Sequence, residues 1–258
     1  MRGIGAHEQV KQTVTEHFYI ILPSKDSTAI FWHDGYWASP GTIPKELKEL
    51  LDQGKIDLTC LAVMSLGPGK SWFARWGSNA LWNFDGLDPR DKGRLETTIR
   101  AIAADPDRLG GIEGIISFSF GQTGEAVLVH NFGSIATWSN YPPPSGDFTY
   151  QINHALQSGK KILQVAIGVG GCSVIQLQDV SGCAWSKHCP DWPPPDLVKY
   201  LAKRDGQPLR RVYCSVMDHE YWFVSYINEA GHNVVDGTLE DSAETQFRRI
   251  FSLIVSVF

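Results

Sequence analysis

The sequence lacks every short motif that marks a common nucleotide, metalloprotease or serine-hydrolase site. It contains no G-x-S-x-G, no Walker loop, no Rossmann glycine fingerprint and no H-E-x-x-H. The glycine-rich run Gly168 to Gly171 falls between two expected strands, so it has no helix N-terminus that could hold a phosphate. The sequence therefore predicts no cofactor.

Positive charge is also scarce. The formal net charge of the 258 residues is −5, and the only adjacent arginines are the isolated pairs Arg210-Arg211 and Arg248-Arg249. A nucleic-acid-binding protein needs a basic face, because neutralising phosphates supplies most of its affinity. We therefore expect no nucleic-acid partner.

The chain contains few cysteines, and their number is odd. Both facts argue against a disulfide framework in a chain of this length. The five are Cys60, Cys172, Cys183, Cys189 and Cys214. Cys183 and Cys189, with His188, do not have the spacing of a structural zinc site, and no second pair accompanies them. We expect no metal and reduced thiols.

Long apolar runs are missing at both ends. Residues 1–20 show no apolar core followed by small residues, so no signal peptide is visible. The run Phe251 to Phe258 is too short to span a bilayer. The pattern predicts a cytoplasmic protein without a membrane partner, with secretion by a non-classical route as the alternative.

What the chain does have is a repeated unit rich in aromatic residues. Its clearest copy lies between Leu58 and Leu87, where three short strands are separated by Gly67-Pro68-Gly69-Lys70 and Gly77-Ser78-Asn79. A helix over Asp91 to Ala104 follows, with Leu95, Ile99 and Ile102 on one face.

The same order, three strands and then a helix, occurs five times. We place the repeats at about 8–55, 56–109, 110–159, 160–207 and 208–258, within a single domain spanning 1–258. The third strands align Trp37, Trp82, Trp138, Trp185 and Val235. A period near 50 residues is typical of a repeat array whose units bury their faces against one another.

Five such units in one chain favour a closed ring, because closure leaves no exposed sheet edge. We therefore expect a mainly β fold with short helices, a five-bladed β-propeller built from five βββα repeats of about 50 residues. An open β-rich solenoid is the alternative. It is less favoured because no unit resembles a polar cap.

One motif also resembles a known kind of protein. The pattern G-P-x-G-x-W-F, a turn, and then x-x-W followed by proline and a helix, clearest from Leu66 to Trp82, is similar to degenerate propeller-type repeats of fungal proteins. Five-bladed propellers of this length include tachylectin-type sugar-binding lectins, which the chain resembles in architecture only. The resemblance implies a lectin-like protein.

The ends of the second strands supply the candidate site residues. One column of equivalent positions contains Trp32, Trp76, His130, Leu177 and Tyr226, and the neighbouring column contains Phe31, Arg75, Val129, Gln176 and Ser225. Aromatic rings can stack on the apolar faces of sugars, while Arg75 and Gln176 can bond to hydroxyl groups. The alternative for the aromatic column is packing between repeats.

Three functions stay open. The first is carbohydrate binding between repeats or on one ring face, through Trp32, Trp76, Arg75, His130, Gln176 and Tyr226. The second is a cofactor-independent cyclase, isomerase or hydrolase that acts on a hydrophobic small molecule in a central pocket, with His130, Arg75, Asp34 and Tyr226 as catalytic candidates. The third is a protein-interaction scaffold. The sequence does not indicate an oligomeric state.

Overall fold

The computed structural model describes residues 19–24, 27–32, 35–139, 146–168, 173–178, 183–185, 197, 209–215, 222–227, 233–238 and 245. Within these residues the protein is mainly β with a few short helices, as the repeats predicted. The strands are β1 (Tyr19–Ser24), β2 (Ser27–Trp32), β3 (Gly35–Ala38), β4 (Leu61–Leu66), β5 (Trp72–Trp76), β6 (Asn79–Asn83), β7 (Ser117–Phe120), β8 (Ala126–His130), β9 (Ile135–Ser139), β10 (Ile162–Ile167), β11 (Ser173–Leu177), β12 (Cys183–Trp185), β13 (Leu209–Cys214), β14 (Trp222–Ile227) and β15 (Asn233–Thr238). The α-helices are α1 (Lys45–Asp52), α2 (Pro89–Ala104), α3 (Pro106–Leu109) and α4 (Gly146–Gln157). Short 3₁₀ turns are η1 (Leu58–Cys60), η2 (Pro68–Lys70), η3 (Ile112–Gly114) and η4 (Asn131–Gly133).

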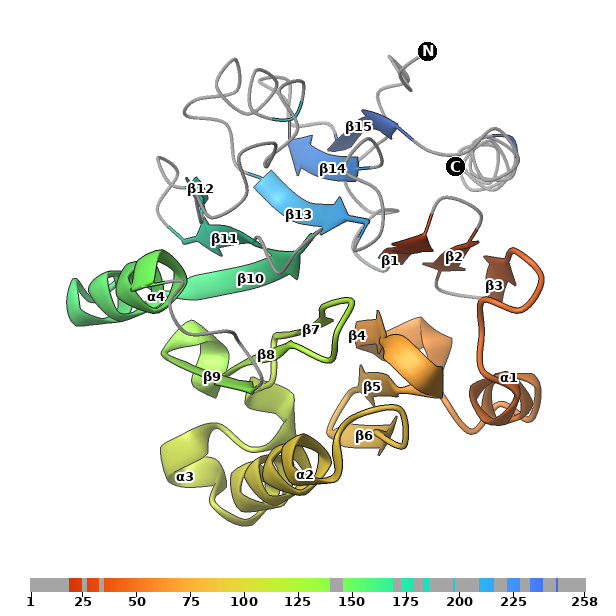
Figure 1. Cartoon of the computed structure of the whole chain (residues 1–258), viewed down its shortest axis with the longest axis horizontal. Helices are drawn as coiled ribbons and strands as arrows, with labels where there is room; N and C mark the ends of the chain where they lie inside the picture. The colour runs from red at the N-terminus through yellow and green to blue at the C-terminus, as the bar shows by residue number, and fades with distance from the viewer. Residues whose placement is uncertain are drawn as a thin grey trace.

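The strands form five separate sheets. Each sheet is an antiparallel meander of three consecutive strands, from β1–β2–β3 to β13–β14–β15, and each lies within one of the five expected repeats. Figure 1 shows the sheets arranged around a common centre with the helices at the periphery. The first strands are innermost and contact one another in the cyclic order β1, β4, β7, β10, β13 and back to β1.

The identification with lectin-like five-bladed propellers is wrong. Among the described residues the structure shows five small sheets whose strands pair only within their own sheet, and none of the sheets is closed. The motif that suggested the resemblance has local causes instead. Gly67 lies against the ring of Phe120, where an added Cβ would come within 2.6 Å, and Gly69 takes a positive φ of 57° against Gly86. These contacts account for the glycines of this turn, so the motif does not require a relationship to any family.

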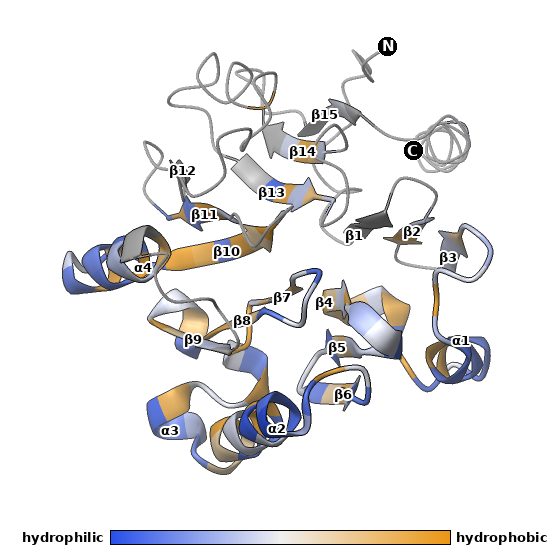
Figure 2. Cartoon of the chain, in the orientation of Figure 1, coloured by the Kyte–Doolittle hydropathy of each residue, from blue (hydrophilic) through white to orange (hydrophobic). Residues whose placement is uncertain are grey.

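Each described α-helix that follows a sheet closes the outer side of the gap before the next sheet. Leu47 and Leu51 of α1 join one apolar cluster with residues of β2, β4 and β5. In the same way α2 packs between the second and third sheets, and α4 packs between the third and fourth. Figure 2 shows α1 and α2 with hydrophobic residues on one side and hydrophilic residues on the other. Burial of these apolar stripes is the main force that joins the sheets.

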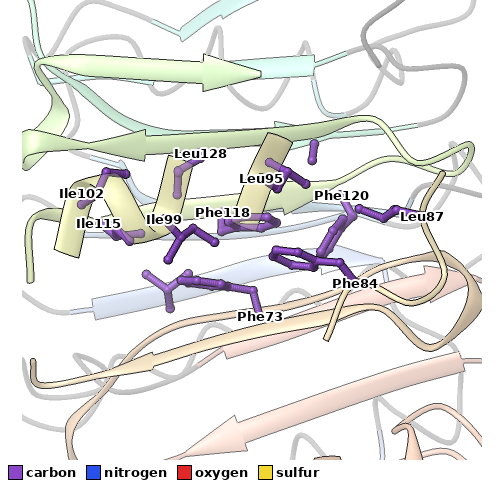
Figure 3. Packing of buried hydrophobic residues seen from close by; sticks show 12 residues of the cluster. Phe73, Phe84, Leu87, Leu95, Ile99, Ile102, Ile115, Phe118, Phe120 and Leu128 are labelled. Atoms are coloured by element: carbon purple, nitrogen blue, oxygen red, sulfur yellow. The ribbon is translucent and has the colours of Figure 1, made fainter. Parts of the chain in front are cut away.

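The gap between the second and third sheets shows this packing in detail. Figure 3 shows Leu95 and Ile99 of α2 next to a group of phenylalanines that includes Phe118. Phe73 of β5 stacks on Phe118 of β7 with ring centroids 4.6 Å apart, and Phe118 lies 4.8 Å from Phe120. The amphipathic face of α2 predicted from the sequence is confirmed, because Leu95, Ile99 and Ile102 are its buried residues.

Side chains also bond the inner strands of neighbouring sheets to each other. The amide of Gln164 on β10 donates to the carbonyl of Val212 on β13 at 2.6 Å and accepts from its N–H at 3.0 Å. Between the third and fourth sheets, the hydroxyl of Ser119 donates to the carbonyl of Val165. The N–H of Val165 in turn donates to the hydroxyl of Ser117 at 3.4 Å. These bonds satisfy backbone groups that apolar packing alone would leave unpaired.

Candidate functional site

The strand register aligns three members of the expected aromatic column. Trp76, Leu177 and Tyr226 each lie opposite the first residue of their inner strand, namely Leu61, Ile162 and Leu209. The register then shifts by one residue at the same place in all three pairs, a repeated β-bulge. The second, fourth and fifth sheets are therefore structurally equivalent at this end, whereas β1–β2 shifts at another place and β7–β8 shows no shift.

The two proposed columns do not converge on one site. Successive side chains of a strand point to opposite faces of its sheet, so Trp76 and Arg75 lie on different faces. Trp76 is half-buried against the cluster between the first and second sheets. Arg75 donates through Nη1 to the carbonyl of Gly77 at 2.8 Å, which holds its side chain along its own hairpin.

His130 is a buried residue at the end of β8, with 3% of its surface exposed. Its Nδ1 lies 3.3 Å from the carbonyl oxygen of Leu109, and its Nε2 lies 3.4 Å from the hydroxyl of Thr137. Burial lowers the pKa of His130, opposed by the hydrogen bond to Leu109. The ring is therefore neutral at pH 7, and both of its nitrogens already face a partner.

The other predicted site residues are spread over different sheets. Gln176 is buried on β11 opposite Gln164 of β10, in the fourth sheet. Trp32 is half-buried in the first sheet, with its indole ring over Gly35, where an added Cβ would come within 2.8 Å. Asp34 and the side chain of Tyr226 lie outside the described residues.

Two aromatic side chains pack on the apolar cluster at the boundary between the sheet β1–β2–β3 and the sheet β4–β5–β6, which we call the first seam. Tyr36 of β3 and Trp76 of β5 are both half-buried, and both pack on the apolar cluster that fills this boundary. Tyr36 also stacks on Phe31 with ring centroids 6.1 Å apart. The first seam therefore combines a buried apolar base with two partly exposed rings.

A chain of polar groups lies at the outer side of the first seam. The hydroxyl of Tyr36 donates to Oδ1 of Asp52 at 2.5 Å, and Nζ of Lys48 bonds to Oδ2 at 2.5 Å. The hydrogen bond from Lys48, and then that from Tyr36, lowers the pKa of Asp52. Burial, followed by the bond to Asp52, raises the pKa of Tyr36. At neutral pH the seam thus presents a neutral phenol, a carboxylate and an ammonium group.

Comparison with known proteins places the chain in no family. No family model, no curated protein and no solved structure matches the chain. The similarity to fungal propeller-type repeats thus has no support beyond the short motif that suggested it.

The described residues contain neither a candidate metal site nor a membrane-spanning helix. Among these residues no group of three or more histidine, cysteine, aspartate or glutamate side chains could hold a metal ion. No helix in the described part of the chain is long and apolar enough to cross a membrane.

Sequence reasoning missed Tyr36, Lys48 and Asp52 as members of a site. Lys48 and Asp52 are one helical turn apart on α1, a spacing that the sequence shows. The sequence did not indicate which face of β3 lies toward the second sheet. The third-strand alignment placed Trp37 with Trp82. The register instead pairs Trp37 with Ile30 of β2 and Trp82 with Phe73 of β5. The expected alignment of the third strands is therefore off by one residue, and Tyr36 rather than Trp37 lies at the first seam.

Proposed function

We propose that the protein binds carbohydrate and that the first seam holds the site. The observation that supports this is the pair of half-buried rings, Tyr36 and Trp76, which neighbouring sheets contribute to one apolar cluster. Flat, partly exposed aromatic faces suit the C–H faces of a sugar ring, because both surfaces are apolar and a stacked contact removes them from water.

The polar chain beside the rings supplies the second requirement of such a site. A sugar hydroxyl both donates and accepts hydrogen bonds, so it needs partners of both kinds. Asp52 is an acceptor held ionised by its neighbours, and Lys48 is a donor 2.5 Å from it. Both side chains are at least half exposed, at 58% for Lys48 and 50% for Asp52. A few placed polar groups beside apolar walls are typical of ligand sites.

The arrangement of the units is part of the proposal. Contacts between consecutive first strands, including β13 with β1, support a ring of five units. The equivalent of Trp76 in the seam between the third and fourth sheets is Leu177, which packs into that seam's apolar cluster. We therefore propose one principal site at the first seam rather than five similar ones.

The enzyme alternative is less well supported. It required His130, Arg75, Asp34 and Tyr226 to meet at the centre of the molecule. His130 is buried with a partner at each ring nitrogen, and Arg75 bonds to its own hairpin. A general base must reach the proton that it removes, and the buried position of His130 does not favour this.

A glycan array tests the proposal. The purified protein is compared with Trp76→Ala, and with Trp37→Ala as the matched control, since Trp37 is also half-buried but on the opposite face of β3 from Tyr36. We expect binding to a class of neutral glycans that falls at least tenfold in Trp76→Ala and is retained in Trp37→Ala. No binding by the folded wild-type protein, or equal binding by Trp76→Ala, would refute the proposal.

A further inference from the structure

Two junctions between neighbouring sheets share one arrangement of side-chain bonds. Gln164 of β10 and Ser117 of β7 occupy the same position in their inner strands, because they pair with equivalent residues of the second strands. The amide of Gln164 bonds to both backbone groups of Val212, and the hydroxyl of Ser117 accepts from the N–H of Val165. Val212 and Val165 also share a position, one residue further along the inner strand. A side chain at one fixed place therefore bonds to the edge of the next inner strand.

The inner strands need such bonds because each of them is an edge strand. Among the described strands, β10 and β13 each pair with one neighbour, so one edge of each presents N–H and C=O groups without a ladder partner. Buried backbone groups of this kind cost free energy unless another group bonds to them. In both junctions the preceding sheet supplies the missing partner through a side chain.

Arg211 occupies this position in β13, the inner strand of the fifth sheet. Successive side chains alternate between the faces of a strand, so Arg211 lies on the face that Gln164 uses in β10, the face directed at the next sheet. The next inner strand in the cyclic order is β1, which contacts β13. Within β1, Ile20 pairs with Ile30 of β2 and so has the place that Val165 has in β10.

We propose that Arg211 joins the fifth sheet to the first by donating hydrogen bonds from its guanidinium group to the backbone carbonyl of Ile20. The strands of these two sheets pair only within their own sheet among the described residues, so no ladder joins them. A guanidinium group carries donors only, and it therefore serves the carbonyl but not the N–H, whereas Gln164 serves both groups of Val212. Because arginine stays protonated at all physiological pH values, this contact does not titrate.

The second sheet shows that a polar residue at this position is not obligatory. Val63 has the same place in β4 and belongs to the apolar cluster that α2 covers. That boundary is closed by the stacked rings of Phe73 and Phe118. A half-buried arginine in the fifth sheet is therefore a departure from apolar packing, as Gln164 is in the fourth. The competing role for Arg211 is an ion pair with a carboxylate.

Hydrogen exchange of backbone amides, measured by NMR on the full chain, tests the proposal with two substitutions. Arg211→Met keeps an unbranched side chain but removes every donor. Arg211→Gln introduces the group that Gln164 uses. We expect the amides of β1 to exchange at least tenfold faster in Arg211→Met. In Arg211→Gln they should exchange no faster than in the wild type. The Ile20 amide should be at least threefold slower there, because the new oxygen accepts from it.

The amide of Val165, at the junction of the third and fourth sheets, is the internal control and should exchange at the wild-type rate in both variants. Unchanged exchange of β1 in Arg211→Met overturns the proposal, and so does equal acceleration of Val165. Equal acceleration of β1 by both substitutions shows that Arg211 pairs with a carboxylate instead and also overturns it. If Arg211→Met does not fold, Arg211→Gln decides: a slower Ile20 amide supports the contact, and an unchanged or faster one rejects it.

Discussion

His130 shows how burial changes the chemistry that a residue suggests in the sequence. An imidazole within a column of mostly aromatic residues suggests an acid–base group or a ligand contact. In the structure it occupies the space between β8, the last carbonyl of α3 and the hydroxyl of Thr137. It is a neutral core residue that anchors the turn carrying Phe132.

The lowered pKa of His130 predicts a loss of stability in acid. Because burial lowers the folded-state pKa below the ordinary value of 6.5, protonation favours the unfolded chain. The stabilisation is therefore complete above pH 6.5 and is lost as the pH falls through the folded-state pKa. Urea unfolding between pH 7.5 and 5 measures it. A His130→Gln variant should show a flatter pH dependence in this window, and an unchanged slope would contradict the assignment.

Ser173 affects the stability of the folded state in a different way. Its hydroxyl is fully buried and has no hydrogen-bond partner among the described residues, whereas Ser119 donates to the carbonyl of Val165. Ser173→Ala should therefore raise the free energy of unfolding by about 1 kcal/mol, since an unsatisfied buried group is removed. Ser119→Ala is the matched control and should lower it by about 1 kcal/mol. Urea unfolding of both variants decides the point, and destabilisation by Ser173→Ala would show that the hydroxyl has a partner.

At the scale of elements, the segment after β6 is packed more tightly at Gly86 than α2 is at Gly93. Gly86 lies against η2 so closely that an added Cβ would be 2.0 Å from the carbonyl oxygen of Pro68. Gly93, within the exposed part of α2, would meet nothing within 4 Å. The same glycine-to-alanine change should therefore have opposite effects at these two places.

Thermal and urea unfolding test this contrast. Gly86→Ala should cost about 3 kcal/mol, because the backbone of η2 has to move. Gly93→Ala should stabilise the protein by about 1 kcal/mol, because alanine loses less backbone entropy in a helix. Similar destabilisation by both substitutions would mean that α2 does not form as described.

The elements also show what the sequence could predict. Periodicity identified the buried face of α2 and the strand order within each unit, because both follow from local patterns. It placed Trp37 in the wrong register, since a slip of one residue leaves the composition of a strand unchanged but reverses its faces. The first seam could not be found for the same reason. Tyr36 and Asp52 meet only because α1 folds back against its own sheet.

At the scale of the whole molecule, Gln164 joins the inner strands of two sheets. Its amide pairs with both backbone groups of Val212, and all the groups involved are buried. Gln164→Leu should cost about 3 kcal/mol, because a backbone donor and acceptor are left without partners. Ser117→Ala, which removes a longer 3.4 Å bond between sheets, should cost less than about 1 kcal/mol.

Hydrogen exchange gives an independent measure of this junction. The amide of Val212 should be protected in the wild type and should exchange faster in Gln164→Leu. If Gln164→Leu unfolds at the same urea concentration as the wild type, the amide does not hold the fourth and fifth sheets together.

The most direct measurement for the first seam is a titration of the indole N–H resonances with the best glycan from the array. The chain contains nine tryptophans, so nine signals report on separate regions. Trp76 is assigned with a Trp76→Phe variant. We predict that the Trp76 signal shifts most and in a saturable manner, while the signal of Trp72, which is buried in the same cluster at the other end of β5, shifts little. Shifts confined to other tryptophans, or no saturable shift at all, would contradict carbohydrate binding at the first seam.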